Sequence, residues 1–150
     1  EMMQRTAAEV KAEAASLGIE APLILAVTVL TSITDQQLKE EMYVEGINVR
    51  ELAVKWAALA KASGLDGVVC SPKEITAIRD ACGPDFKIVT PGIRPLWSEV
   101  NDQKRITTPW DAMDLGADYM VIGRPITKAE NPRAAAIRIM EELEGNSHAE

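Results

Sequence analysis

Hydrophobic residues gather along the chain in four short runs, and a glycine precedes each run. The runs lie at about residues 22–28, 66–70, 86–90 and 118–122, and the glycines are Gly18, Gly64, Gly83 and Gly116. Within each run most apolar residues are consecutive and do not alternate with polar ones, which is typical of strands buried on both faces of a parallel sheet. A glycine directly after a helix is a common left-handed cap. The pattern therefore predicts a repeated unit of helix end, glycine and strand.

Polar residues and prolines mark where helices begin. Capping-box spacing is present in Thr34 with Gln37, Asn48 with Glu51, and Ser71 with Glu74. Proline stands at an expected first helical position at Pro72, Pro109 and Pro132. We predict helices at about residues 2–17, 35–43, 48–63, 72–82, 108–115 and 132–144. The order is one helix followed by four βα units.

Repeated βα units build either an open doubly wound sheet or a closed (β/α)₈ barrel. A barrel needs about 200 residues or more, and this chain has 150 residues and half the strands. Its first residues already follow a helical pattern, with apolar positions 3, 7, 10, 14 and 17 on one face and no capping residue before them. We therefore expect residues 1–144 to be part of a larger α/β domain whose front half is missing or made separately, and residues 145–150 to be a disordered tail.

Composition and charge narrow the possible partners. The chain is 47% hydrophobic and has a formal net charge of −7. Nucleic acid and anionic membranes require a basic face, so we expect neither as a partner. No apolar run approaches the roughly 20 residues of a membrane span, and no charged-then-apolar leader precedes the first helix. We expect a globular, cytoplasmic protein.

The side chains available for catalysis are few. The two cysteines, Cys70 and Cys82, lack metal-binding spacing, and the single histidine is His148 in the terminal segment EGNSHAE. Neither a Ser-His-Asp or Cys-His nucleophile system nor a multi-histidine metal site can be built from this sequence. We expect no metal site and no disulfide.

Positive side chains and glycines follow the third and fourth strands, whose carboxyl ends are where ligands bind in both architectures. The connection at residues 91–107 is long enough to be a binding loop or lid, and it contains Arg94. Gly123 and Arg124 follow the fourth strand. Glycine permits close backbone approach and arginine supplies charge-assisted donors, which favours a phosphate site. The alternative is that the glycines only turn the strand ends and the arginines are solvated.

Other polar and aromatic residues at this edge have two interpretations. The hydroxyls of Thr31 and Ser32, near the end of the first strand, can bond a base or a sugar, or can satisfy nearby backbone. Trp97 lies on the long loop, where a lid role is open to it.

Five stretches also carry a resemblance to a known family. They are EMMQRTAAEV (1–10), LILAVTVLTS (23–32), SGLDGVVCS (63–71), FKIVTPGIRP (86–95) and NDQKRITTPWDAMDLGADYMVIGRPIT (101–127). In order and spacing the chain resembles the bacterial-type orotidine 5′-phosphate decarboxylase family over nearly its whole length. The resemblance implies a homodimeric (β/α)₈ TIM barrel, of which this chain supplies the C-terminal half, strands five to eight with the preceding helix. The implied enzyme is a carboxy-lyase that converts orotidine 5′-phosphate to UMP in pyrimidine biosynthesis without a cofactor.

The same resemblance implies substrate-binding roles for five residues. Thr31 is similar to a contact near the nucleotide. Arg94 and Gln103 are similar to groups that enclose the phosphate as the long loop closes. Gly123 and Arg124 match the phosphate-binding backbone and guanidinium after the last strand.

The family's catalytic motif, D-x-K-x-x-D, does not occur in this sequence. The segment DQK at 102–104 matches its first three positions, but Thr107 stands where the last aspartate is needed. We therefore expect no catalytic residue in this chain and no activity of the chain alone. The alternative function is an isolated half-barrel that binds a nucleotide or sugar phosphate without catalysis. Other phosphate-handling barrels, such as epimerases, lack the PGIRP and DQ pair.

Overall fold

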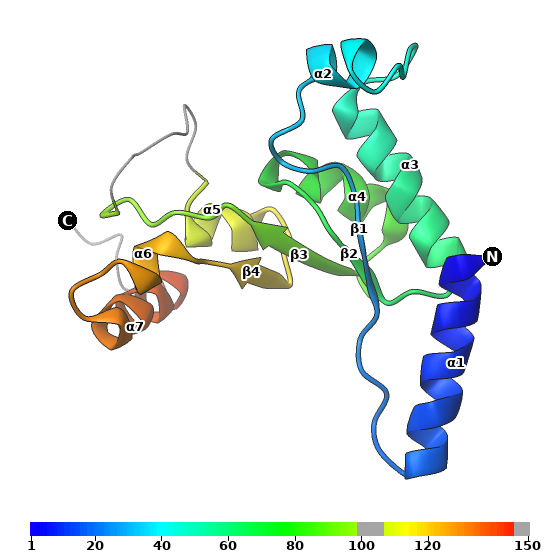
Figure 1. Cartoon of the computed structure of the whole chain (residues 1–150). Coiled ribbons are helices and arrows are strands. Elements are labelled where there is room, and N and C mark those ends of the chain that lie inside the picture. The colour runs from blue at the N-terminus through cyan, green and yellow to red at the C-terminus, as the bar shows by residue number, and fades with distance from the viewer. Residues whose placement is uncertain (99–106, 146–150) are drawn as a thin grey trace.

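Four parallel strands pair in the order in which they occur in the sequence (Figure 1). The computed structural model describes residues 1–98 and 107–145. The strands are β1 (Leu25–Val27), β2 (Gly67–Val69), β3 (Lys87–Pro91) and β4 (Tyr119–Val121). The parallel sheet expected from the βα repeat is confirmed. Since parallel neighbours end at the same edge of a sheet, the loops after all four strands emerge on one side.

Helices precede and connect these strands. They are α1 (Met2–Leu17), α2 (Asp35–Glu40), α3 (Val49–Ala62), the 3₁₀ helix η1 (Pro72–Glu74), α4 (Ile75–Cys82), α5 (Pro109–Asp114), α6 (Arg124–Thr127) and α7 (Pro132–Leu143). All three predicted capping boxes are present, and a fourth joins Thr108 with Asp111. The four predicted cap glycines have positive φ. Local sequence signals therefore set most helix boundaries.

Several elements differ from the sequence prediction, and the helix predicted at 72–82 is divided into η1 and α4. The helix predicted at 35–43 ends at Glu40, and the chain takes a left-handed conformation at Tyr43, with φ 56°, which no α-helix contains. The strand predicted at 22–28 covers only residues 25–27, and this strand pairs with β2 alone. The segment after Gly123, for which no helix was predicted, forms the short helix α6.

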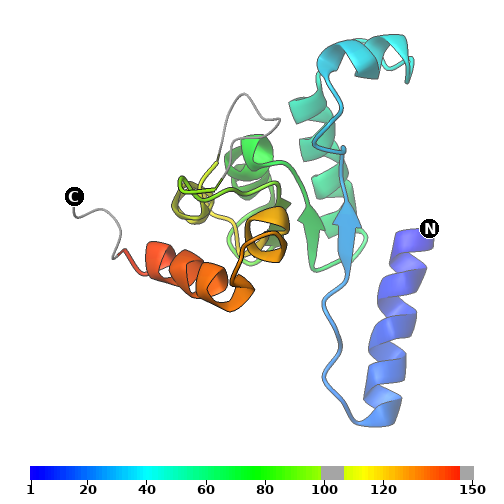
Figure 2. The same cartoon turned by 60° about the vertical axis from the view of Figure 1, so that its left-hand side comes forward.

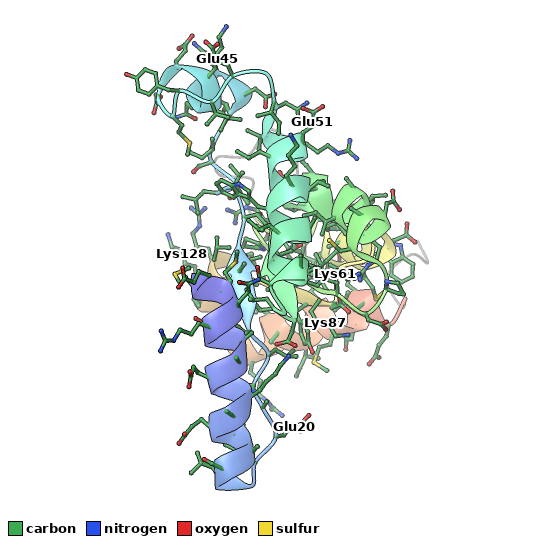
Figure 3. The ribbon with its side chains drawn as sticks, turned by 90° about the vertical axis from the view of Figure 1, so that its right-hand side faces the viewer. Glu20, Glu45, Glu51, Lys61, Lys87 and Lys128 are labelled. Carbon is green, nitrogen blue, oxygen red and sulfur yellow. The ribbon has the colours of Figure 1, made fainter. Side chains whose placement is uncertain are left out.

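One face of the sheet packs against helices. Strand residues on this face include Val68 and Ile88, which are fully buried. They meet alanines of α1, α3 and α5 and the isoleucines of α4, namely Ala7, Ala57, Ala60, Ala112, Ile75 and Ile78. Small alanine side chains allow α3 to lie close to the strands. Helix α1 continues the line of α3 beyond the sheet (Figures 1 and 3), and α7 lies on the opposite side of the molecule (Figure 2).

The other face of the sheet is not covered by any helix of the described chain. Val27, Val69, Val89 and Tyr119 lie in one row across the four strands, since each pairs with the next. At the two edges the row is exposed, with Val27 at 62% and Tyr119 at 50%. The prediction that every strand is buried on both faces is therefore wrong for β1 and β4, because the helices cover one face only.

Two aspartates make the same pair of hydrogen bonds at the amino ends of the strands. The Asp66 carboxylate accepts the N–H of Ile24 at 2.8 Å, and the Asp66 N–H donates to the Ile24 carbonyl at 2.9 Å. Asp118 makes the equivalent bonds with Ile88, both at 2.9 Å. Each aspartate stands two residues after a cap glycine. The repeat of the sequence is therefore also a repeat of side-chain hydrogen bonding.

Arg79 of α4 connects the loops before β3 and β4. Its guanidinium donates to four backbone carbonyls at 2.6 to 2.9 Å, those of Gly83, Pro84, Phe86 and Gly116. It also forms a 2.6 Å salt bridge with Asp118, whose other oxygen lies 3.3 Å from Lys87 Nζ. Burial alone would raise the pKa of Asp118, but the Ile88 N–H, Arg79 and Lys87 together lower the pKa below its usual value. The ionised carboxylate is thus the form that stabilises the fold.

We expect Asp118→Asn to lower the free energy of unfolding by about 2–3 kcal/mol near neutral pH, because it leaves a partly buried arginine without its counter-charge. A lowered pKa contributes stability above the unfolded-state value of about 4, and this contribution is lost as the pH falls through the folded-state value. The difference between the variant and the unaltered chain should therefore shrink in acid. Urea unfolding at neutral pH and near pH 3 measures it, with exposed Asp114→Asn as the control. A difference that is independent of pH would contradict this account.

Candidate functional site

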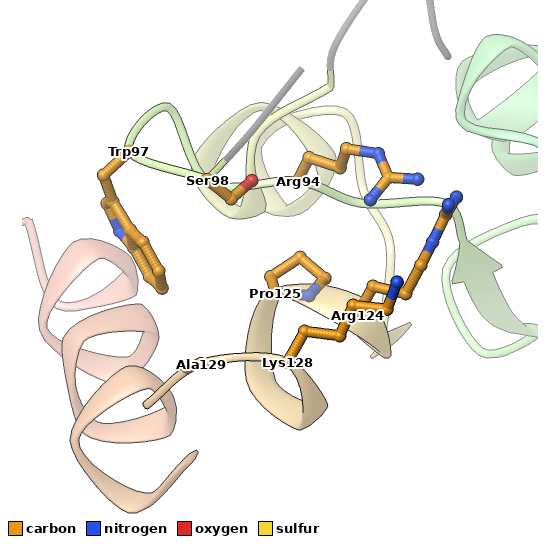
Figure 4. A pocket seen from close by; sticks show the side chains of 7 residues that line it. All are labelled: Arg94, Trp97, Ser98, Arg124, Pro125, Lys128 and Ala129. Carbon is orange, nitrogen blue, oxygen red and sulfur yellow. The ribbon is translucent and has the colours of Figure 1, made fainter. Parts of the chain in front are cut away.

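A hollow of about 230 Å³ opens beside the loops that follow β3 and β4 (Figure 4). We call it the cationic hollow. Its lining residues are Arg94, Trp97, Ser98, Arg124, Pro125, Lys128 and Ala129. Three of these side chains are basic and none is acidic. The chain carries a net charge of −7, so this is a local concentration of positive charge on an acidic protein.

Arg94 is held in the wall of this hollow by its backbone. The chain turns at Gly92, whose φ of 79° requires a left-handed conformation that glycine adopts without steric cost. The Arg94 N–H then donates to the Thr107 carbonyl at 3.0 Å, which joins the two ends of the long loop. The side chain is 7% exposed, and its buried Nε has no hydrogen-bond partner among the described residues. A buried donor without a partner is costly, so this nitrogen is suited to an external acceptor.

Helix α6 presents Arg124 and Lys128 to the same hollow. The two side chains run in the same direction, toward the side where the Arg94 guanidinium lies (Figure 4). They are four residues apart, which places them on one face of a helical turn. At the start of this helix Pro125 has no N–H, and the N–H groups of Ile126 and Thr127 donate to the Gly123 carbonyl. At most the amides of residues 123 and 124 can therefore reach a ligand from this turn.

The space beside Gly123, directly before the first residue of α6, is open. A Cβ built on this residue would meet no atom within 4 Å, whereas one on Gly67 in β2 would lie 2.2 Å from the Lys87 carbonyl oxygen. Gly67 is thus required by the close approach of two strands, and Gly123 is not required by any such contact. The sequence prediction that Gly123 gives a ligand close access to the backbone is compatible with this geometry.

Trp97 forms the wall opposite the basic residues (Figure 4). It belongs to a turn in which both the N–H and the hydroxyl of Ser98 donate to the Pro95 carbonyl, at 3.0 and 2.9 Å. The Arg138 guanidinium of α7 lies 4.7 Å from the centre of the Trp97 ring, within the range of a cation–π contact. This contact holds the first part of the long loop against α7. The lid role predicted for the loop stays a prediction.

A second hollow, of about 190 Å³, lies at the carboxyl ends of β1, β2 and β3. We call it the strand-end hollow. It is lined by Val27, Val29, Leu30, Thr31, Ser32, Val69, Cys70 and Pro91. It is mostly apolar, and two hydroxyls lie at its rim. Pro91 lines this hollow, and Arg94, three residues further along the chain, lines the cationic hollow. A mostly apolar hollow and a cationic hollow suit the two ends of a nucleotide.

Nearby polar groups are engaged in structure or are chemically inert. The hydroxyl of Thr28 donates to the Val69 carbonyl at 2.9 Å, so it satisfies local backbone. Burial raises the pKa of the Cys70 thiol to about 12, which suppresses the reactive thiolate. Burial likewise raises the pKa of Glu74, whose carboxylate accepts the Ser71 N–H in a capping box. These groups support the strand ends and are poor candidates for catalysis.

Within residues 1–98 and 107–145, no cluster of three or more His, Cys, Asp or Glu side chains is placed to hold a metal ion. In these parts of the chain no helix has the length and apolar character to cross a membrane. The three basic side chains of the cationic hollow are suited to binding an anion.

Comparison with known proteins identifies the relatives of this chain. The profile of the family described as "Orotidine 5'-phosphate decarboxylase / HUMPS family" matches residues 1–139. The chain belongs to this family. It is 64% identical over 144 residues to orotidine 5′-phosphate decarboxylase of Syntrophomonas wolfei, which covers 96% of this chain and 60% of that protein. It is 54% identical over 143 residues to the enzyme of the same name from Moorella thermoacetica, with 95% and 56% of the two chains covered.

Solved structures of the orotidine 5′-phosphate decarboxylase / HUMPS family share the fold. The crystal structure of orotidine 5′-phosphate decarboxylase from Lactobacillus acidophilus superposes with a TM-score of 0.71 at 41% identity, covering 84% of this chain and 51% of that one. The chain thus spans little more than half the length of the relatives it matches. Its parallel α/β sheet is the fold of these family members in part.

The structure places four of the five predicted site residues. Arg94 and Arg124 line one hollow, and Gly123 directly precedes α6 beside it. Thr31 is exposed and lines the separate strand-end hollow. Gln103 lies outside the described residues, so its predicted role stays untested. Lys128 was missed by sequence reasoning. If residues 124–127 had been predicted as a helix, Lys128 would have been placed on the same helical face as Arg124.

Proposed function

We propose that this chain supplies the phosphate- and nucleotide-binding part of an orotidine 5′-phosphate decarboxylase. The observation that carries the proposal is the cationic hollow, because Arg94 and Arg124 follow different strands and line one space, and none of its described lining residues is acidic. The strand-end hollow offers apolar surface and the Thr31 hydroxyl to the rest of a nucleotide. Membership of the family and the 64% identity to a named decarboxylase support the same substrate.

We also propose that the four strands are the last four of a (β/α)₈ barrel, strands five to eight. The uncovered face of the sheet supports this, because residues such as Val27, Tyr119 and Val121 are 50–62% exposed and would become interior in a closed barrel. The two edge strands, β1 and β4, each have one unused row of backbone groups for a further strand. The partner would be the N-terminal half of the barrel; this chain spans only 60% and 56% of the two named relatives, which supports a missing segment.

In the proposed reaction the bond between C6 of the pyrimidine and its carboxylate breaks, CO₂ leaves, and a proton is delivered to C6 to give UMP. The family resemblance assigns that proton to a lysine of the D-x-K-x-x-D motif, which this sequence does not contain. The residues described here would act on the phosphate, at a distance from C6. Their binding energy would be used to close the loop and to assemble the reactive pocket.

The remaining parts of the proposal rest on the family resemblance. We infer that the whole enzyme is a cytoplasmic homodimer that uses no cofactor. We also infer that this chain by itself does not decarboxylate orotidine 5′-phosphate, since the proton donor is supplied by another segment. The competing function is that of an isolated module that binds a nucleotide phosphate without catalysis. Such a module would use the same cationic hollow but would have no decarboxylase activity.

A chimaera tests the proposed reaction. This chain replaces the matching 144 residues of the Syntrophomonas wolfei enzyme, and decarboxylation of orotidine 5′-phosphate is followed by the loss of its absorbance. We expect turnover by the chimaera and none by the purified 150-residue chain. Turnover by the chain alone would contradict the assignment of catalysis to the other segment. A folded chimaera without turnover, verified by circular dichroism, would favour the binding module.

In the active chimaera, Arg124→Ala should lower kcat/KM for orotidine 5′-phosphate by the equivalent of several kcal/mol, because it removes a charge-assisted contact with the phosphate. Orotidine, which lacks the phosphate, separates this role from a structural one. Its slow turnover should be the same in the variant and the parent. Arg133→Ala, an exposed arginine on α7 outside the hollow, is the matched control. An unchanged kcat/KM for the phosphorylated substrate would rule out the phosphate contact.

A further inference from the structure

Lys128 is the third basic side chain of the cationic hollow, and the family resemblance gave it no role. It stands at the C-cap of α6, one helical turn beyond Arg124, and its side chain is exposed. In Figure 4 its side chain runs in the same direction as that of Arg124, toward the side of the hollow on which the Arg94 guanidinium lies. The side chain therefore points to the same space as the two arginines.

We propose that Lys128 is a phosphate-binding residue, and that it makes the hollow favour a doubly charged phosphate monoester over a singly charged phosphodiester. This inference rests on the proposed function, since it concerns the same hollow.

The charges on the wall give the physical reason. Arg94 and Arg124 together carry two positive charges, which match a phosphate dianion in number. Among the described residues that line the hollow none is acidic, so a third cation raises the local potential further. Each additional negative charge on the ligand then contributes more binding free energy. The contribution is larger where water is excluded, as at the buried Arg94. A monoester with two charges benefits more from this potential than a diester with one.

The chemistry of the three donors is also complementary. Arginine offers a rigid fork that binds two oxygens of one phosphate, whereas lysine acts as a compact point charge with rotatable donors. Arg94 is fixed by its backbone bond to Thr107 and by its burial, while Lys128 lies on an exposed helix end. A flexible ammonium can therefore reach the oxygen that the arginines leave unbound.

A purely structural role for Lys128 has a different signature. A lysine at a helix C-terminus can stabilise the last carbonyls of the helix. In that case its replacement would lower stability and leave the preference among ligands unchanged. The ratio of two affinities therefore distinguishes a binding residue from a capping one.

The test measures binding of UMP and of its methyl phosphodiester to the 150-residue chain by calorimetry. The two ligands share the nucleoside and differ by one methyl group and one charge. We expect Lys128→Gln to weaken UMP binding about five- to tenfold, as for the loss of one charge-assisted contact, and to weaken the diester less. Lys55→Gln, on the exposed face of α3, removes the same charge elsewhere and should change neither affinity.

The outcomes separate this inference from the proposed function. If UMP binds and Arg94→Gln abolishes binding, but Lys128→Gln behaves as Lys55→Gln, the role of Lys128 is refuted and the phosphate site stands. Equal weakening of both ligands by Lys128→Gln would refute the charge preference. If neither the unaltered chain nor the chimaera binds UMP or its diester, both proposals fail. Circular dichroism confirms that each variant is folded.

Discussion

The pairing of β3 with β4 is the interaction on which the candidate site depends. Their parallel register, Val89 with Tyr119 and Pro91 with Val121, makes both strands end at one edge of the sheet. The loop that carries Arg94 and the helix that carries Arg124 and Lys128 therefore start side by side. At the opposite ends of the same strands, Arg79 and Asp118 bind the connecting loops through a salt bridge and a set of backbone bonds. Loss of the Arg79 and Asp118 interactions would allow the two strands to shift relative to each other. The basic side chains would then no longer converge on one hollow.

The sheet has a dry face and a face that is open. On the dry face, valine and isoleucine pack against small residues of α3 and against α4. On the open face, the same kind of apolar residue remains in contact with solvent at both edges. Burial of such surface is the main source of free energy in folding, and an exposed apolar sheet with unused edges also invites association. In the proposed barrel, a second segment would complete the closure and bury the open face. This would account for strands that are apolar on both faces although the helices cover only one face.

Much of the fold could be predicted from the sequence, because it rests on local interactions. Capping boxes such as Asn48 with Glu51 and the glycine caps act within a few residues, and the convergence of Arg94 and Arg124 follows from parallel strand order alone. Other features could not be predicted. The helix α6 has four residues and follows Gly123 with Arg-Pro, a sequence equally suited to a turn, so the place of Lys128 on the face of Arg124 was not predicted. An apolar run predicts that a strand is buried, but it does not show which element covers the strand. The bonds of Arg79 join residues up to 39 positions apart, which no local pattern reveals.

The central claim is that the cationic hollow holds the phosphate of a nucleotide. A crystal structure of the chain with bound UMP tests it most directly. We expect the phosphate oxygens to lie within hydrogen-bonding distance of the Arg94 and Arg124 guanidinium groups, with the pyrimidine directed toward the strand-end hollow and Thr31. A phosphate bound at another surface, with the guanidinium groups of the hollow unchanged by the ligand, would contradict the account.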